Sequence, residues 1–187
     1  PGSPSWPTSP PPCSMTRLQT CVDAAAIHCQ SWSTTRQSLS SGPNGHPDHR
    51  PPMATLPTAD PGPAFATFVA ERHLAVLTLV RSNGRPHSTP VGFTWDADHS
   101  RARVITWSGS RKVSLLTAGP LEGSICQVDG GRWLTIEGTC TVTSDLAACA
   151  DAVRHYATRY RPPKERGNER RVILLEATRI LAGGPLA

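Results

Sequence analysis

Lysine is nearly missing from this 187-residue sequence, which holds only Lys112 and Lys164. The formal net charge is no more than +5, and the basic residues form no dense stripe of the kind that nucleic-acid-binding surfaces show. A mild excess of positive charge is better suited to a local site for an anionic small molecule. The sequence therefore predicts a small-molecule substrate and no nucleic-acid partner.

Long apolar runs, paired cysteines and nucleotide-binding motifs are also missing. No apolar run reaches the ~18 residues that a membrane-spanning helix needs, so we expect no membrane segment. The cysteines show no CxxC spacing and no other metal-ligand set stands out, which argues against a metal site. Neither GxGxxG nor GxxxxGK(S/T) occurs, so the Rossmann and P-loop classes are excluded. With no secretory signal visible, the expected location is the cytoplasm.

Proline and serine are concentrated at one end of the chain. Residues 1–52 hold 10 of the 19 prolines and 9 serines, with little apolar periodicity. Such a segment cannot bury enough apolar surface to offset the entropy lost on ordering, so a disordered tail is predicted. Because Met53 opens ordinary globular composition, residues 1–52 are interpreted as a tail or an upstream read-through, and a targeting peptide is the alternative. Residues 53–187 are expected to form one folded domain.

The apolar pattern of residues 53–187 predicts strands with a few helices. Proline and glycine at residues 60–63 indicate the start of a first helix. Strands are expected at residues 74–80, 85–95, 101–106, 124–128, 132–142 and 171–180. A short helix is expected over residues 113–117. A long helix is expected over residues 145–160, capped by Ser144, with an apolar stripe of Leu146, Cys149, Val153 and Tyr156.

The strands are predicted to pair as antiparallel hairpins. The Ser82-Asn83-Gly84 turn joins the first two strands, and the first three strands are expected to form a meander. In the fifth strand, Leu134, Ile136, Cys140 and Val142 alternate with polar residues, as in a strand with one buried face. Antiparallel hairpins with few crossover helices indicate a mainly β fold, a small closed or split β-barrel, and argue against a doubly wound sheet.

Residues 106–112, with the sequence TWSGSRK, combine features that suit a phosphate group. They lie between an expected strand and an expected helix, where small residues free backbone N–H groups and the helix N-terminus carries partial positive charge. Arg111 and Lys112 add full charges at this point. The alternative is that these basic residues simply begin a surface helix and are solvated.

Seven short segments occur in a fixed order within residues 68–182. They are ERHLAVLT from Glu71, GRPHSTPVGF from Gly84, RVIT from Arg103, SRK from Ser110, QVDGGRWL from Gln127, EG from Glu137 and RYR from Arg159. This ordered set resembles the split β-barrel flavin and deazaflavin oxidoreductases, the pyridoxamine-5'-phosphate-oxidase-like fold that binds FMN in many members. Within this family the chain is most similar to the actinobacterial branch that uses coenzyme F-420, a deazaflavin.

The resemblance implies an enzyme that transfers a hydride from F-420 to an unsaturated acceptor such as biliverdin. It also implies a homodimer with the cofactor at the interface between the two chains. Since a deazaflavin performs hydride transfer on its own carbon, the protein mainly binds and orients it, and no catalytic side chain is expected. His87 is interpreted as a structural residue, with the role of proton donor as the alternative.

The resemblance also assigns residues to the cofactor site. Ser110, Arg111 and Lys112 would hold the phosphate, and Thr89, Pro90 and Val91 would line the ring system. Four residues would lie near the cofactor or substrate, namely Gln127, Asp129, Arg132 and Trp133. Two residues are candidates for the oligoglutamate tail by charge and placement, namely Arg159 and Arg161.

Two other functions fit the same fold. The first is an FMN-dependent oxidase or oxidoreductase, because a phosphate site does not distinguish FMN from F-420. The second is a non-catalytic split barrel that carries flavin or haem. The several arginines favour the polyanionic tail of F-420, and no histidine of residues 53–187 stands in a context typical of a haem ligand.

Overall fold

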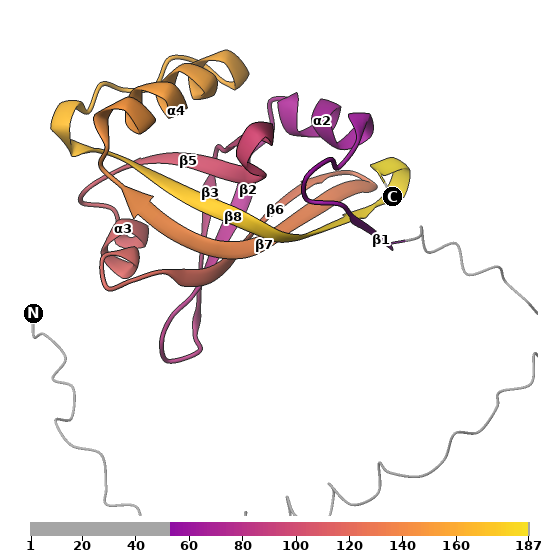
Figure 1. Ribbon diagram of the computed structural model, residues 1–187, viewed down its shortest axis with the longest axis horizontal. Coiled ribbons are helices and arrows are strands. Elements are labelled where there is room, and N and C mark those ends of the chain that lie inside the picture. Colours follow the sequence, from indigo (N-terminus) through magenta and orange to yellow (C-terminus); the bar gives the residue numbers. More distant parts are fainter. Residues whose placement is uncertain (1–52, 187) are drawn as a thin grey trace, which may run out of the picture. The chain divides into compact units, whose positions relative to one another are not determined.

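The structure of this protein is a computed structural model, and it describes residues 53–186. Eight strands and three helices, with short 3-10 turns between some of them, make up this part of the chain (Figure 1). In chain order they are β1 (Met53–Leu56), α2 (Pro63–Ala70), β2 (Ala75–Val80), β3 (Pro86–Val91), β4 (Thr94–Asp96), β5 (Arg101–Trp107), α3 (Arg111–Leu116), β6 (Leu121–Asp129), β7 (Arg132–Thr143), α4 (Leu146–Arg159) and β8 (Arg170–Gly183). The predicted disordered tail, residues 1–52, lies outside the described residues.

All eight strands belong to one antiparallel sheet with the order β3-β2-β6-β7-β8-β5-β4, and β1 pairs with β8. The strands at the two ends of this order, β3 and β4, follow each other in the chain with only Gly92 and Phe93 between them. The three Cα–Cα steps from the last residue of β3 to the first of β4 span only about 10 Å even when fully extended, so the two edges of the sheet lie close together at this point. The sheet therefore curls into a barrel that is split at this point, and the predicted mainly β, split-barrel fold is confirmed.

The predicted meander is present in part. β2 pairs with β3, and β5 pairs with β4, which is the end of the expected strand over residues 85–95. This expected strand is broken into β3 and β4 at Gly92, and β5 takes β8 as its second and longer partner. Strand β1 was not expected, because its four residues carry little pattern of their own; it forms by pairing with the end of β8. Local periodicity indicates a strand but does not select its partner, and here a partner about 70 residues away is preferred.

The core lies inside the barrel and follows the alternation of the strands. In β2 the inward residues Ala75, Leu77 and Leu79 are buried, and in β7 the predicted inward residues Leu134 and Ile136 are fully buried. Two phenylalanines of α2, Phe65 and Phe68, close one side of the barrel. Burial of such large apolar side chains stabilises each by roughly 1.5–3 kcal/mol, so the interior of the barrel is the main source of stability.

Helix α4 lies against β4, β5 and β8, and Figure 1 shows it on the side of β5 and β8. Asp145 caps this helix, because its Oδ1 accepts a hydrogen bond from the Ala148 N–H at 2.8 Å; the predicted cap at Ser144 is wrong by one residue. The expected apolar stripe is also partly wrong, since Leu146 is 72% exposed. Cys149 and Ala152 are the buried residues of the helix. No helix in the described part of the chain is long and apolar enough to cross a membrane.

Candidate functional site

A pocket of about 720 Å³ opens beside the split in the barrel. Its walls come from the end of β3, the end of β5, the start of α3, helix α4 and the loop that follows α4. The lining residues are Pro90, Val91, Gly92, Ile105, Thr106, Trp107, Lys112, Tyr156, Arg161, Pro162, Pro163, Lys164, Arg166 and Arg170. One wall is apolar and aromatic, and the other is basic, so the pocket suits a ligand with a ring system and an anionic part.

The basic wall holds five cations, and no acidic residue lines the pocket. The loop after α4 and the start of β8 supply Arg161, Lys164, Arg166 and Arg170, and α3 supplies Lys112. The Arg166 guanidinium lies 5.0 Å from the centre of the Trp107 ring, which fixes a charge beside the aromatic wall. A concave surface lined by one sign of charge concentrates ligands of the opposite sign.

Lys112 is a half-buried cation of this wall that has no ion-pair partner in the described part of the chain. Its side chain is half-buried, and this burial lowers the pKa of the ammonium group. No carboxylate of residues 53–186 lies within ion-pair distance of it. A desolvated charge without a partner costs free energy, and an anionic ligand would offset that cost.

The segment around Ser110 has the expected strand–turn–helix arrangement. The Ser110 N–H donates to the Trp107 carbonyl at 3.0 Å, and its hydroxyl accepts a hydrogen bond from Thr106 Oγ1 at 3.0 Å. Ser110 is buried and begins α3, so it shapes the turn that presents Lys112. It is not among the residues that line the pocket.

Arg111 points to a different hollow from Lys112. It lines a second pocket, of about 560 Å³, together with Arg81 and Asn83 of the β2–β3 turn. His87 of β3 is affected by the charges of residues that line both pockets. Its pKa is lowered by burial first and then by the charges of Arg81, Arg111 and Lys112.

The ring-lining candidates separate in a similar way. Pro90 and Val91 line the large pocket, as does Gly92, which the sequence did not single out. Thr89 is half-buried and stands opposite Leu77 in the β2–β3 ladder. It is not a lining residue of the large pocket.

Gln127 and Arg159 bind each other below the large pocket's wall. The fully buried Gln127 accepts a hydrogen bond from Arg159 Nη2 at 2.7 Å and donates to the Phe68 carbonyl at 3.0 Å. Burial lowers the pKa of Arg159, and its other two side-chain nitrogens, Nε and Nη1, each donate to a backbone carbonyl. Of the two candidates for the oligoglutamate tail, Arg161 therefore lines the large pocket and Arg159 does not.

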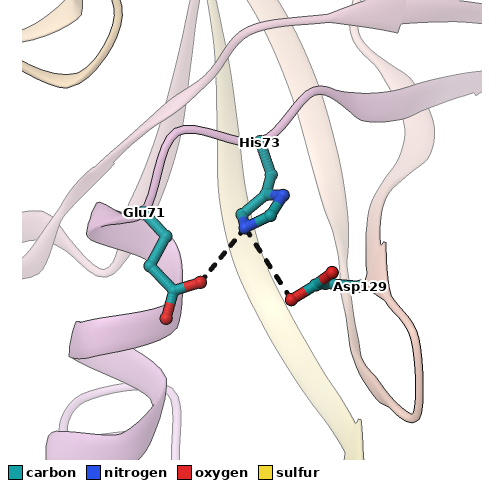
Figure 2. Close-up of side chains that lie close together, drawn as sticks. All are labelled: Glu71, His73 and Asp129. Atoms are coloured by element: carbon teal, nitrogen blue, oxygen red, sulfur yellow. Dashed lines mark hydrogen bonds and ion pairs between the residues drawn. The ribbon is translucent and has the colours of Figure 1, made fainter.

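Asp129 belongs to a cluster with Glu71 and His73, two residues that precede β2 (Figure 2), and Arg132 forms an ion pair with it. Glu71, His73 and Asp129 bring three metal-ligand types together, with His73 Nε2 lying 3.1 Å from a Glu71 oxygen and 3.9 Å from an Asp129 oxygen. Arg132 donates to both Glu71 oxygens, at 2.8 and 2.9 Å, and also binds Asp129. Its hydrogen bond is the main reason why the pKa of Glu71 is lowered. Arg132 thus supplies the positive charge that this cluster needs.

Trp133 lies in β7 directly opposite Gly183 of β8. A side chain at Gly183 would start only 2.3 Å from the indole nitrogen of Trp133, so the ring rests on the glycine backbone. Trp133 does not line the large pocket, and neither do Gln127, Asp129 and Arg132.

Residues 61–182 match the family described as pyridoxamine 5'-phosphate oxidase. The chain belongs to this family. Over 120 residues it is 45% identical to a biliverdin reductase of Mycobacterium tuberculosis that depends on reduced coenzyme F-420, and the match covers 64% of this chain and 85% of that protein. The expected resemblance to the oxidase-like family and to its F-420-dependent branch is confirmed.

Two solved structures show the same fold as this member of the oxidase family. A conserved hypothetical protein of Mycobacterium tuberculosis has a TM-score of 0.54 at 20% identity, covering 64% of this chain and 81% of that one. An F-420 reductase has a TM-score of 0.50 at 20% identity, covering 61% of this chain and 93% of that one. At such low identity these likenesses bear on the fold alone.

Sequence reasoning missed several pocket residues of this family member. Trp107 stood within the singled-out segment without an assigned role, and Tyr156 was interpreted as packing. The signal that could have found the basic wall was the clustering of Arg161, Lys164 and Arg166 in one proline-bearing loop. In the sequence this loop resembles an ordinary charged surface connection, and only the structure shows that it lines the pocket.

Proposed function

We propose that this chain is an oxidoreductase that uses coenzyme F-420 to transfer a hydride to an unsaturated acceptor such as biliverdin. The family membership and the 45% identity to an F-420-dependent biliverdin reductase support this function. The single structural observation that carries it is the half-buried Lys112 ammonium at the head of a basic pocket with one apolar wall.

The chain's own residues divide the binding work between the two walls of the large pocket. Pro90 and Val91 would lie against the ring system of the deazaflavin, and Lys112 would bind its phosphate, presented by Ser110 at the turn before α3. Arg161 would meet the acidic tail. Arg111 would join through the neighbouring hollow, where it stands with Arg81.

Coenzyme F-420, when bound, supplies a hydride from its own ring. The protein's contribution is then to bind, orient and exclude water. The pocket wall at Pro90 and Val91 is rigid, because proline has a fixed φ and Val91 is buried and paired with Ala75. Trp107 and Tyr156 line the pocket with aromatic surface. Holding the cofactor ring and the acceptor in one geometry can remove a large part of the activation barrier of a reaction between two molecules.

We also propose that two copies of the chain form a dimer. The outer face of β2 and β6 exposes Val76, Val80 and Val128, each more than 40% exposed. Val76 stands opposite Pro90 on one side and Cys126 on the other, so this apolar strip runs up to the pocket. Exposed apolar strips of this kind mark association surfaces. A small-molecule enzyme of this kind is expected to work in the cytoplasm.

Titration with F-420 and, separately, with FMN tests the function. We expect saturable binding of F-420, and consumption of reduced F-420 only when an acceptor such as biliverdin is present. A protein that is yellow as purified, binds FMN and not F-420, and produces hydrogen peroxide without an acceptor would instead be an FMN oxidase. A Soret band in the purified protein would indicate a haem carrier.

A further inference from the structure

The C-terminal end of α4 is bonded to the split between β3 and β4. Arg159 donates through Nη1 to the Phe93 carbonyl at 2.5 Å and through Nε to the Glu71 carbonyl at 2.9 Å. The Tyr160 hydroxyl accepts a hydrogen bond from the Phe93 N–H at 3.1 Å and donates to the His73 carbonyl at 2.7 Å. Phe93 lies between two strands and takes part in neither ladder, so these two side chains satisfy both of its backbone groups.

Aromatic and cationic contacts reinforce the same attachment. The Arg159 guanidinium lies 4.5 Å from the centre of the fully buried Phe93 ring and 5.1 Å from that of Tyr160. Each of its three side-chain nitrogens donates one hydrogen bond to an oxygen of the protein, namely two backbone carbonyls and the Gln127 side chain. Arg159 is therefore a cation that holds backbone in place, and it does not line the large pocket.

Gly92 shows how closely the split is pressed onto α4. A Cβ at this residue would lie 2.8 Å from a ring carbon of Tyr156 and 3.1 Å from the ring of Tyr160. The two tyrosine rings are stacked with their centres 4.7 Å apart. Tyr156, Gly92 and the two residues before it line the large pocket, so the position of this wall depends on α4.

We propose that Arg159 and Tyr160 are positioning residues that fix Gly92 and Phe93 at the wall of the pocket, and so fix where the cofactor ring lies, without touching the cofactor. This inference rests on the proposed function, since it takes the large pocket as the cofactor site. The backbone at Gly92 and Phe93 has no ladder partner to hold it, so removal of the Tyr160 hydroxyl releases the wall.

The test compares Tyr160→Phe with Asp145→Ala, a variant that weakens the opposite end of the same helix. Asp145 caps α4 through the Ala148 N–H and does not line the pocket, so its loss lowers the stability of the helix only. Both variants should lower Tm. Only Tyr160→Phe should raise the Kd for F-420, by about tenfold, which corresponds to about 1.4 kcal/mol.

Hydrogen exchange provides a readout that needs no ligand. In Tyr160→Phe the Phe93 N–H has no partner, so the amides of residues 91–94 should exchange faster while those in the middle of α4 keep their rates. If wild-type protein fails to bind F-420, the proposed function is wrong, and the exchange rates still decide whether the two residues fix the wall. If Tyr160→Phe matches Asp145→Ala in exchange at residues 91–94, or if it binds F-420 as tightly as Asp145→Ala does, the proposal is overturned.

Discussion

Replacing Lys112 by methionine should separate ligand binding from folding. The ammonium group is half-buried and has no carboxylate partner among residues 53–186, so in the free protein it is desolvated without compensation. Methionine has a similar length and fits the apolar part of the same environment. We therefore expect Tm to stay the same or rise slightly, whereas loss of a paired lysine would lower it.

The expected loss of binding follows from the chemistry of the contact. A hydrogen bond between an ammonium and a phosphate contributes about 1.5–3 kcal/mol. The Kd for F-420 should therefore rise by a factor of about 10 to 150. Because the contact is ionic, the difference between variant and wild type should shrink as the salt concentration rises.

Fluorescence titration of F-420 at low and high salt measures this effect, and thermal melts measure stability in parallel. Arg154→Met is the matched control, because it also removes one positive charge. The Arg154 side chain is 72% exposed on α4, pairs with Asp151 and does not line the pocket. An unchanged Kd in Lys112→Met at low salt, or a loss no larger than that in Arg154→Met, would refute the phosphate assignment.

Four further predictions follow from the same structure. Burial and three nearby cations hold the pKa of His87 below its usual 6.5, so near that pH the imidazole takes up a proton in the unfolded chain and not in the folded one. The stability of the fold should therefore fall as the pH drops below 6.5, and thermal melts of His87→Gln should show a weaker decline. We expect the wild-type protein to be a dimer in light scattering and Val76→Asp to be a monomer, and a variant that stays dimeric would contradict the proposed interface. Burial raises the pKa of Cys140 to about 12, so its thiol is no nucleophile; Cys140→Ala should retain turnover, and a large loss of kcat would show otherwise. A chain that begins at Met53 should keep its Tm and its F-420 affinity, and a large drop in either would assign residues 1–52 to the domain.

Local features of the fold were predictable because their causes are local. The alternation in β7 follows from one buried face, and the turn at Ser110 follows from small residues between a strand and a helix. The pairing of β5 with β8 was not predictable, because several strands of similar pattern could have served as the partner. The need for glycine at position 92 was also hidden, since it comes from the packing of two distant tyrosines.

The site was predictable in part for the same reason. Charge alone made Arg159 a candidate for the acidic tail, but its partners come from residues 32, 66 and 88 positions away in the chain. Arg111 and Lys112 are neighbours in sequence, yet they serve different hollows, since successive residues of a helix point about 100° apart. A sequence shows which charges are present, whereas tertiary packing decides which of them face a ligand.

Strand β8 has a consequence for how the protein is made. It pairs with β1, β5 and β7 and follows all three in the chain, so during synthesis those strands leave the ribosome before the strand that joins them exists. Until then the nascent chain presents unpaired edges, which are templates for association with other chains. The barrel closes only after residue 183 has been made. A chain that ends before residue 170 lacks β8, so we expect it to be bound by chaperones or degraded and to have no partial activity.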